Sequence, residues 1–214
     1  PGINFNMHRV FRESMPGAFD LMIRYNLEPE IYSFPLLRNF ISAASRHGLT
    51  EYPVHIKIDT GMHRLGFMPE EAENLAKEII TSGQVRIASV FSHLSAAENP
   101  EHDSFTRMQA AIFRDVSERI RAVTGYNFIR HLLNTQGIMR FPEYQFEMVR
   151  PGIGLYGIES TTDHGFRQAL RYVTRILQIK TVPAGQPVGY GCGDISDRER
   201  KIAILPAGYA DGID

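Results

Sequence analysis

Residues 54–66, VHIKIDTGMHRLG, give the strongest indication of the fold. Apolar and polar side chains alternate over the first six positions, which is the pattern of a β-strand. One face would carry Val54, Ile56 and Ile58, and the other His55, Lys57 and Asp59. Strands of parallel sheets are usually apolar on both faces. The polar face therefore needs partners inside the protein, as it would have if it lined the interior of a barrel.

Similar strand patterns recur over the first 150 residues, separated by helical patterns. Strands are expected at residues 30–33, 54–59, 85–91 and 128–134, and helices at 35–47 and from Pro69 onward. A long helix closed by Gly125 has apolar side chains at helical spacing: Phe105, Met108, Ile112, Val116, Ile120 and Val123. Strands separated by helices predict parallel βα units, which both a partial (β/α) barrel and a doubly wound sheet provide.

The pattern changes after about residue 160. Residues 171–182, 186–190 and 201–205 are expected to form strands joined by turns. We predict a boundary near Ser160–Asp163, with a partial barrel domain at 1–160 and the start of a mostly β domain at 161–214. The predicted fold class is α/β, an incomplete (β/α)8 TIM barrel followed by this β domain, and we expect a piece of a larger protein.

The composition excludes several classes of protein. Of the 214 residues, 43% are hydrophobic and 22% charged, which is ordinary for a globular protein and unlike a disordered or coiled-coil chain. The net charge of −1 supports neither a nucleic-acid partner nor an anionic membrane, and no apolar run approaches the roughly 20 residues of a membrane span. The single cysteine, Cys192, fits a reducing compartment, so we expect a cytoplasmic protein.

Polar residues follow the predicted strands at the end where barrel active sites gather. Lys57 lies near the end of its strand, and Gly61 and Gly66 permit a tight turn that returns Arg64 to that end. An ordinary ion-pair network of Asp59, Lys57 and Arg64 explains the same residues without any ligand.

Three further segments lie at strand ends: Ser92-His93, Asn134-Thr135-Gln136-Gly137 and Arg150-Pro151-Gly152-Ile153-Gly154. A hydroxyl and small residues at a helix start can hold a phosphate, although a plain helix N-cap predicts them equally. The glycines of the third segment would let backbone amides approach an anion, and its arginine supplies a fixed charge. A phosphate-anchored small molecule at this end of a barrel would account for all of these segments.

Two other candidates have simpler explanations. Residues 189–193, GYGCG, lack the GxxxxGK pattern of a phosphate-binding loop and are typical of a turn around Tyr190. Glu98, His102 and Asp103 match no zinc-binding spacing, so no metal site is predicted.

Together these segments resemble the alanine racemase family of pyridoxal-phosphate (PLP) enzymes, which combine a barrel with a β domain. The similar blocks follow the family's order and cover residues 54 to 214: Lys57–Gly66, Ser92-His93, Asn134-Thr135, Arg150–Gly157, Val188–Gly191 and Pro206–Gly212. The resemblance implies racemisation of L-alanine to D-alanine for peptidoglycan synthesis, with PLP as the cofactor.

The resemblance also implies roles for the barrel residues. Arg64 would hydrogen-bond the phenolic oxygen of PLP, supported by Met62 and by Lys57, which is carbamylated in some members of the family. His93 would pack beside the pyridine ring. The residues expected at the phosphate are Asn134, Thr135, Gly152 and Ile153.

Arg150 would face the pyridine nitrogen of PLP. Because a guanidinium only donates hydrogen bonds, the ring nitrogen would stay unprotonated, which suits racemisation better than transamination. Racemisation needs a base on each face of the α-carbon. Tyr190 matches the family's tyrosine base, which acts on the neighbouring subunit's cofactor in a homodimer, and Tyr209 matches a block that lines the substrate entry.

One family feature is missing. The other base is a Schiff-base lysine in a Lys-x-x-x-Tyr-Gly segment, and the lysines here stand in other settings: Lys57, Lys77, Lys180 and Lys201. We therefore expect that this chain alone cannot racemise alanine. Alternatives are a broader amino-acid racemase, a non-catalytic PLP-binding barrel protein and a module without cofactor. A parent protein fused behind a cell-wall ligase is also compatible with the sequence.

Overall fold

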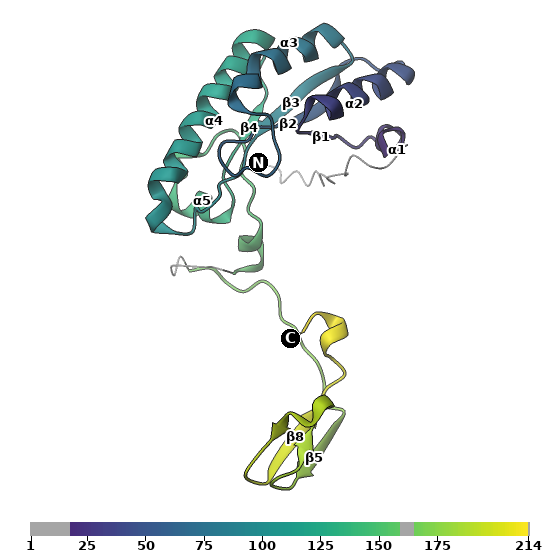
Figure 1. Cartoon of the computed structure of the whole chain (residues 1–214), viewed down its shortest axis with the longest axis vertical. Coiled ribbons are helices and arrows are strands. Elements are labelled where there is room, and N and C mark those ends of the chain that lie inside the picture. Colours follow the sequence, from purple (N-terminus) through teal and green to yellow (C-terminus); the bar gives the residue numbers. More distant parts are fainter. Residues whose placement is uncertain (1–17, 159–164, 214) are drawn as a thin grey trace. The chain divides into compact units, whose positions relative to one another are not determined.

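The computed structural model describes residues 18–158 and 165–213 (Figure 1). It divides into two compact units between Arg167 and Gln168, and each unit is described by itself. The boundary predicted near Ser160–Asp163 lies outside the described residues. Within the described ranges, no helix is both long and apolar enough to cross a bilayer.

The first unit is an α/β unit built on a parallel sheet with the strand order β1-β2-β3-β4. The strands are β1 (Glu30–Ile31), β2 (Tyr52–Lys57), β3 (Val85–Phe91) and β4 (Ile129–His131). The helices are α1 (Ala18–Arg24), α2 (Phe34–Arg46), α3 (Ala72–Ser82), α4 (Asp103–Thr124) and α5 (Thr135–Arg140). Neighbouring strands are consecutive in the chain and a helix follows each, which is the arrangement of a partial (β/α) barrel (Figure 1).

Local sequence explains where these helices begin and end. The hydroxyl of Ser33 accepts a hydrogen bond from the N–H of Leu36 at 3.4 Å and caps α2. Gly83 and Gly125 end α3 and α4 in left-handed conformations, with φ of 66° and 73°. The helix expected from Pro69 starts as a 3-10 turn, Pro69–Glu71, before α3 begins.

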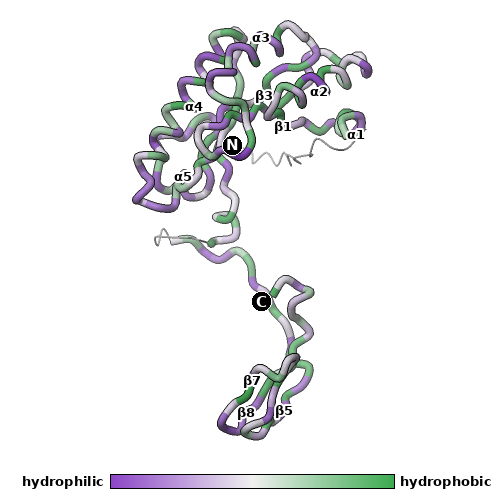
Figure 2. The backbone as a smooth tube through the Cα atoms, viewed as in Figure 1, coloured by the Kyte–Doolittle hydropathy of each residue, from purple (hydrophilic) through white to green (hydrophobic). Residues whose placement is uncertain are grey.

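The core lies between the sheet and its helices. On α4 the predicted apolar stripe is confirmed at Val116 and Ile120, which are fully buried, but Met108 is 44% exposed. Figure 2 shows the same contrast along α4, where hydrophobic and hydrophilic positions alternate. The stripe is wrong at Met108 because an apolar side chain at helical spacing need not reach the sheet at every turn.

The second unit contains two antiparallel strand pairs. Its strands are β5 (Gln178–Val182), β6 (Pro187–Val188), β7 (Asp194–Ile195) and β8 (Arg200–Ile204), with β5 paired to β8 and β6 to β7. Many of its apolar side chains are exposed within the described residues, among them Val173 at 72% and Ile179 at 61%. The described part of this unit therefore buries little apolar surface of its own.

Several predicted strands are longer than the observed ones. The strand expected at 171–182 starts only at Gln178, because its partner β8 ends at Ile204 and leaves residues 171–176 without a strand partner in the described ladder. The strand expected at 186–190 covers only Pro187–Val188 and is followed by a 3-10 turn. Strands predicted at 30–33 and 128–134 shorten to two and three residues, since pairing with their neighbours covers only those positions.

Candidate active site

Lys57 is held inside the sheet by a carboxylate from the neighbouring strand. Its Nζ lies 3.2 Å from Oε1 of Glu30, and the two side chains are 11% and 6% exposed. Lys57 Nζ also lies 5.5 Å from the centre of the Phe91 ring, a cation–π contact. The predicted ion-pair network with Asp59 and Arg64 is wrong at this point, because Glu30 occupies the position beside the ammonium.

Asp59 instead organises the loop that follows β2. One of its carboxylate oxygens accepts hydrogen bonds from the N–H groups of Gly61 at 2.9 Å and His63 at 3.0 Å. Gly66 closes the loop with φ of 136°, and a Cβ there would lie 2.5 Å from the backbone nitrogen of Asp59. The predicted tight turn is therefore confirmed, and within it Arg64 is exposed while Met62 is half-buried.

Arg150 is fixed by main-chain carbonyl groups at the ends of β3 and β4. Its Nη1 donates to the carbonyl of His131 at 2.9 Å, and its Nη2 donates to those of Ser92 at 2.5 Å and Leu132 at 3.1 Å. Among the described residues, Nε makes no hydrogen bond. Burial lowers the pKa of Arg150 to about 10, against the opposing charge of Glu30. The guanidinium thus keeps its positive charge, and its Nε–H is left to donate a hydrogen bond.

A chain of hydrogen bonds runs from Arg150 across the inside of the sheet. Its links are Arg150 Nη1 with His131 Nδ1, His131 Nε2 with Ser89 Oγ (3.0 Å), Ser89 Oγ with His55 Nδ1 (2.6 Å), and His55 Nε2 with Glu28 Oε2 (2.7 Å). The guanidinium only donates and the carboxylate only accepts, so with both imidazoles neutral every link has one direction. Each imidazole then accepts at Nδ1 and donates from Nε2.

His93 lies at the same strand ends and stays neutral at physiological pH. Burial is the main cause that lowers its pKa to about 4, and the positive charges of Arg150, Arg64 and Lys57 lower it further. Its Nδ1 lies 3.5 Å from Nη2 of Arg150. His93, Arg150, Arg64 and Lys57 are therefore close enough to share one electrostatic environment.

The start of α5 and the loop after Arg150 approach each other closely. Asn134 caps α5 by accepting from the N–H of Gly137 at 2.9 Å, which confirms the N-cap reading. Thr135 Oγ1 accepts a hydrogen bond from the N–H of Gly154 at 3.1 Å. A Cβ on Gly154 would lie 2.6 Å from Thr135 Cγ2, so this approach requires glycine. The exposed residues Gly152 and Ile153 complete this cradle.

Tyr190 and Tyr209 lie in the second unit. Both are exposed, and each begins a 3-10 turn, Tyr190–Cys192 and Tyr209–Asp211. Gly189 and Gly191 flank Tyr190 with φ of 78° and 71°, which directs the chain sharply around the phenol. The turn predicted around Tyr190 is confirmed, and the phenol is available to another molecule.

Sequence reasoning missed the interior partners of the strand-end residues. Glu28, Glu30, Ser89 and His131 were not candidates, although they supply the hydrogen bonds or charge that hold Arg150 and Lys57. The signal was available, because polar residues recur at alternate positions on neighbouring strands that face the same interior. Of the acidic residues that follow His93 in the sequence, Asp103 pairs with Arg140 at 2.8 Å. No cluster of three metal ligands occurs in the described ranges.

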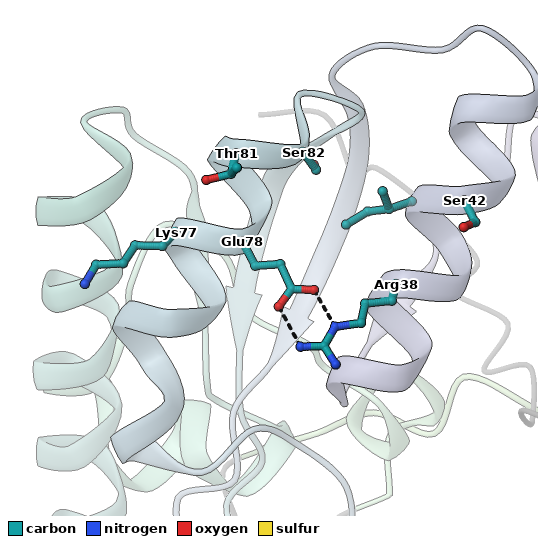
Figure 3. Close-up of a pocket in the computed structure, with 7 residues that line it drawn as sticks. Arg38, Ser42, Lys77, Glu78, Thr81 and Ser82 are labelled. Carbon is teal, nitrogen blue, oxygen red and sulfur yellow. Dashed lines mark hydrogen bonds and ion pairs between the residues drawn. The ribbon is translucent and has the colours of Figure 1, made fainter.

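A groove of about 480 Å³ lies elsewhere, between the outer faces of α2 and α3 (Figure 3). The guanidinium of Arg38 and the carboxylate of Glu78 bridge it with bonds of 2.8 and 3.0 Å. Ser42 and Thr81 also line it. These residues join two helices on the outside of the unit, so the groove is no part of the strand-end site.

The geometry defines an α/β-barrel protein whose strand ends carry fixed cations beside a glycine-containing cradle. The family model described as "Alanine racemase, N-terminal domain" matches residues 6–160, and that described as "Alanine racemase, C-terminal domain" matches residues 169–214. The chain belongs to the alanine racemase family. No part of these matches corresponds to a ligase, so they give no support to a fused ligase.

Individual relatives agree with this assignment. The alanine racemase of Halothermothrix orenii is 32% identical over 208 residues, which are 95% of this chain and 54% of that protein. The solved alanine racemase from Streptomyces coelicolor A3(2) has a TM-score of 0.81 at 26% identity, over 94% of this chain and 54% of the other. That from Bartonella henselae, with covalently bound pyridoxal phosphate, has a TM-score of 0.74 at 26% identity, over 98% and 57%. The chain thus spans about half the length of the curated relatives it matches.

Proposed function

We propose that this chain forms most of the cofactor site of an alanine racemase that interconverts L-alanine and D-alanine with PLP. The observation that carries the proposal is the fixation of Arg150, whose terminal nitrogens are held by backbone carbonyls while Nε makes no hydrogen bond among the described residues. When bound, PLP supplies an electron-withdrawing ring that acidifies the α-hydrogen of an amino acid.

The residues of the first unit fit a planar, phosphate-bearing cofactor. Thr135 and the backbone amides of Gly152 and Ile153 would hold the phosphate, with Asn134 positioning the start of α5. The close approach of Gly154 to Thr135 supports this role, because it brings the loop amides beside the hydroxyl. Neutral His93 would pack on the ring without adding a charge to it.

Two arginines would bind the ring's polar atoms. Arg64 would donate to the phenolic oxygen, and its exposure leaves it able to turn toward a ligand. Arg150 Nε would donate to the pyridine nitrogen. Since this guanidinium keeps its proton even with a pKa near 10, the nitrogen would stay unprotonated at neutral pH. That state favours racemisation over transamination.

Tyr190 would act as one of the two bases, on the cofactor bound by the partner subunit of a homodimer. Its exposed phenol supports a role outside its own unit. Tyr209 would line the path of the substrate. The other base would be a Schiff-base lysine beyond the four lysines of this sequence, so we predict that the 214-residue chain alone is inactive.

The family membership supports a biosynthetic role in supplying D-alanine for peptidoglycan, in the cytoplasm. The match of residues 169–214 to the C-terminal domain favours a racemase over a non-catalytic PLP-binding barrel protein. A broader amino-acid racemase would use the same cofactor site. Comparing the rates of racemisation of serine and of alanine measures how broad the substrate range is.

The test is racemase activity of the full-length protein, with the residues encoded on both sides of this chain. Tyr190→Phe should lower the rate of D-alanine formation by about 100- to 10,000-fold, the usual contribution of a general base. The matched control is Tyr172→Phe, which removes a phenol hydroxyl from the same unit at a 68% exposed position and should leave the rate unchanged. Equal rates for the two variants, or no PLP-dependent D-alanine from the parent, would refute the proposal.

A further inference from the structure

Lys57 and Glu30 face each other because of the register of their strands. Glu30 on β1 lies opposite His55 on β2, so Lys57, two residues further along, points to the same interior face. Their charged groups meet at 3.2 Å, with both side chains almost completely buried. The contact therefore follows from backbone pairing as well as from the side-chain positions.

Two neighbours of Lys57 Nζ, Glu30 and Phe91, favour a positive charge there, whereas the guanidinium of Arg150, 5.4 Å from the centre of the same ring, opposes it. Glu30 Oε1 is a buried acceptor without a well-directed hydrogen bond, so the ammonium opposite is the charge that compensates it. The face of Phe91, 5.5 Å away, also attracts a cation. The other buried carboxylate nearby, that of Asp59, is occupied by the N–H groups of Gly61 and His63.

Carbamylation would reverse this charge. A neutral lysine amine attacks CO2, a nitrogen–carbon bond forms, and one proton leaves the nitrogen for solvent. The side chain then ends in an anion. At Lys57 this anion would lie beside the Glu30 carboxylate and against the negative face of the Phe91 ring, where the burial of both side chains reduces screening by solvent.

We propose that Glu30 is a positioning residue of the site and that it holds Lys57 as an unmodified ammonium ion. No carbamate therefore forms on Lys57 in this protein. Any effect of the Lys57–Glu30 pair on PLP rests on the proposed function. The chemical state of Lys57 is independent of that function, because it is measured without cofactor or substrate.

The test is ¹³C NMR of the full-length protein without PLP in ¹³C-bicarbonate buffer, where a lysine carbamate gives its own resonance. The wild-type protein should show no carbamate that depends on Lys57. Glu30→Gln, which keeps the shape and removes the charge, should gain one. Glu30→Gln combined with Lys57→Arg should lose it again, while Glu30→Gln combined with Lys77→Arg, which removes an exposed amine on α3, should keep it.

A wild-type resonance that disappears in Lys57→Arg would overturn the proposal directly. A folded Glu30→Gln protein without the resonance would also contradict it, because Glu30 would then not be the group that prevents the modification. Circular dichroism establishes that this variant is folded, and Glu30→Thr provides a second neutral side chain if it is not. Because no arm needs PLP, a failure here is separate from a failure of the proposed activity.

Discussion

Ser89 is the link on which the interior hydrogen-bond chain depends, and replacing it by alanine removes two buried bonds at once. With both imidazoles neutral, its hydroxyl accepts from His131 Nε2 at 3.0 Å and donates to His55 Nδ1 at 2.6 Å, and Ser89 itself is 1% exposed. A buried polar group left without its partner costs about 1–3 kcal/mol. Two such groups predict a loss of about 2–6 kcal/mol, a large part of the roughly 5–15 kcal/mol that stabilises a domain.

The assay is urea unfolding, with Ser117→Ala as the matched control. Ser117 is also completely buried, but its hydroxyl makes one local bond, to the carbonyl of Arg114 at 2.9 Å. Its loss should cost no more than about 1 kcal/mol. If the free energies of unfolding of Ser89→Ala and Ser117→Ala fall equally, with unchanged dependence on urea, then Ser89 does not join the two imidazoles and the interior chain is wrong.

Three further perturbations test individual contacts. Gly66→Ala should lower the melting temperature far more than Gly48→Ala. Both glycines have positive φ, but only at Gly66 would a Cβ meet backbone, 2.5 Å from the nitrogen of Asp59. Equal decreases in melting temperature would contradict this crowding. The pKa of His93, followed by NMR, should be about 4. The free energy of unfolding should decrease as the pH falls from about 6.5 to 4, because the His93 side chain of the unfolded chain takes up its proton first. A midpoint near 6.5 would refute this. Thr135→Val removes the acceptor of the Gly154 N–H and should weaken PLP binding by the full-length protein about tenfold. Thr135→Ser keeps the hydroxyl and should bind PLP normally. Equal affinities of the two variants would show that Thr135 is not part of the phosphate site.

The sequence was sufficient to predict the α/β class and the side of the sheet that carries the site. Alternation of apolar and polar residues in 54–59 is a local signal, and the buried polar face that it predicts is present at His55, Lys57 and Asp59. Helix ends at Gly83 and Gly125 follow from local backbone preferences as well.

The partners across the sheet could not be predicted in the same way. Whether Lys57 meets Asp59 or Glu30 depends on the register between β1 and β2, which no local pattern determines. The strand expected at 171–182 is missing before Gln178 for a related reason, since a strand needs a partner and β8 ends opposite Gln178. The roles proposed for Arg150 and Tyr190 came from family resemblance, and the carbonyl groups that fix Arg150 became visible only in the folded chain.

The most direct test of the account is to identify the lysine that carries the cofactor. The full-length protein is incubated with PLP, reduced with borohydride, digested and analysed by mass spectrometry. We expect one pyridoxyl-lysine in a Lys-x-x-x-Tyr-Gly setting beyond this sequence, and a lower yield of this labelled lysine when Arg150 is replaced by leucine. A label on Lys57 or on any other lysine of the 214 residues, or no label at all, would contradict the assignment of the strand-end arginines to a PLP site.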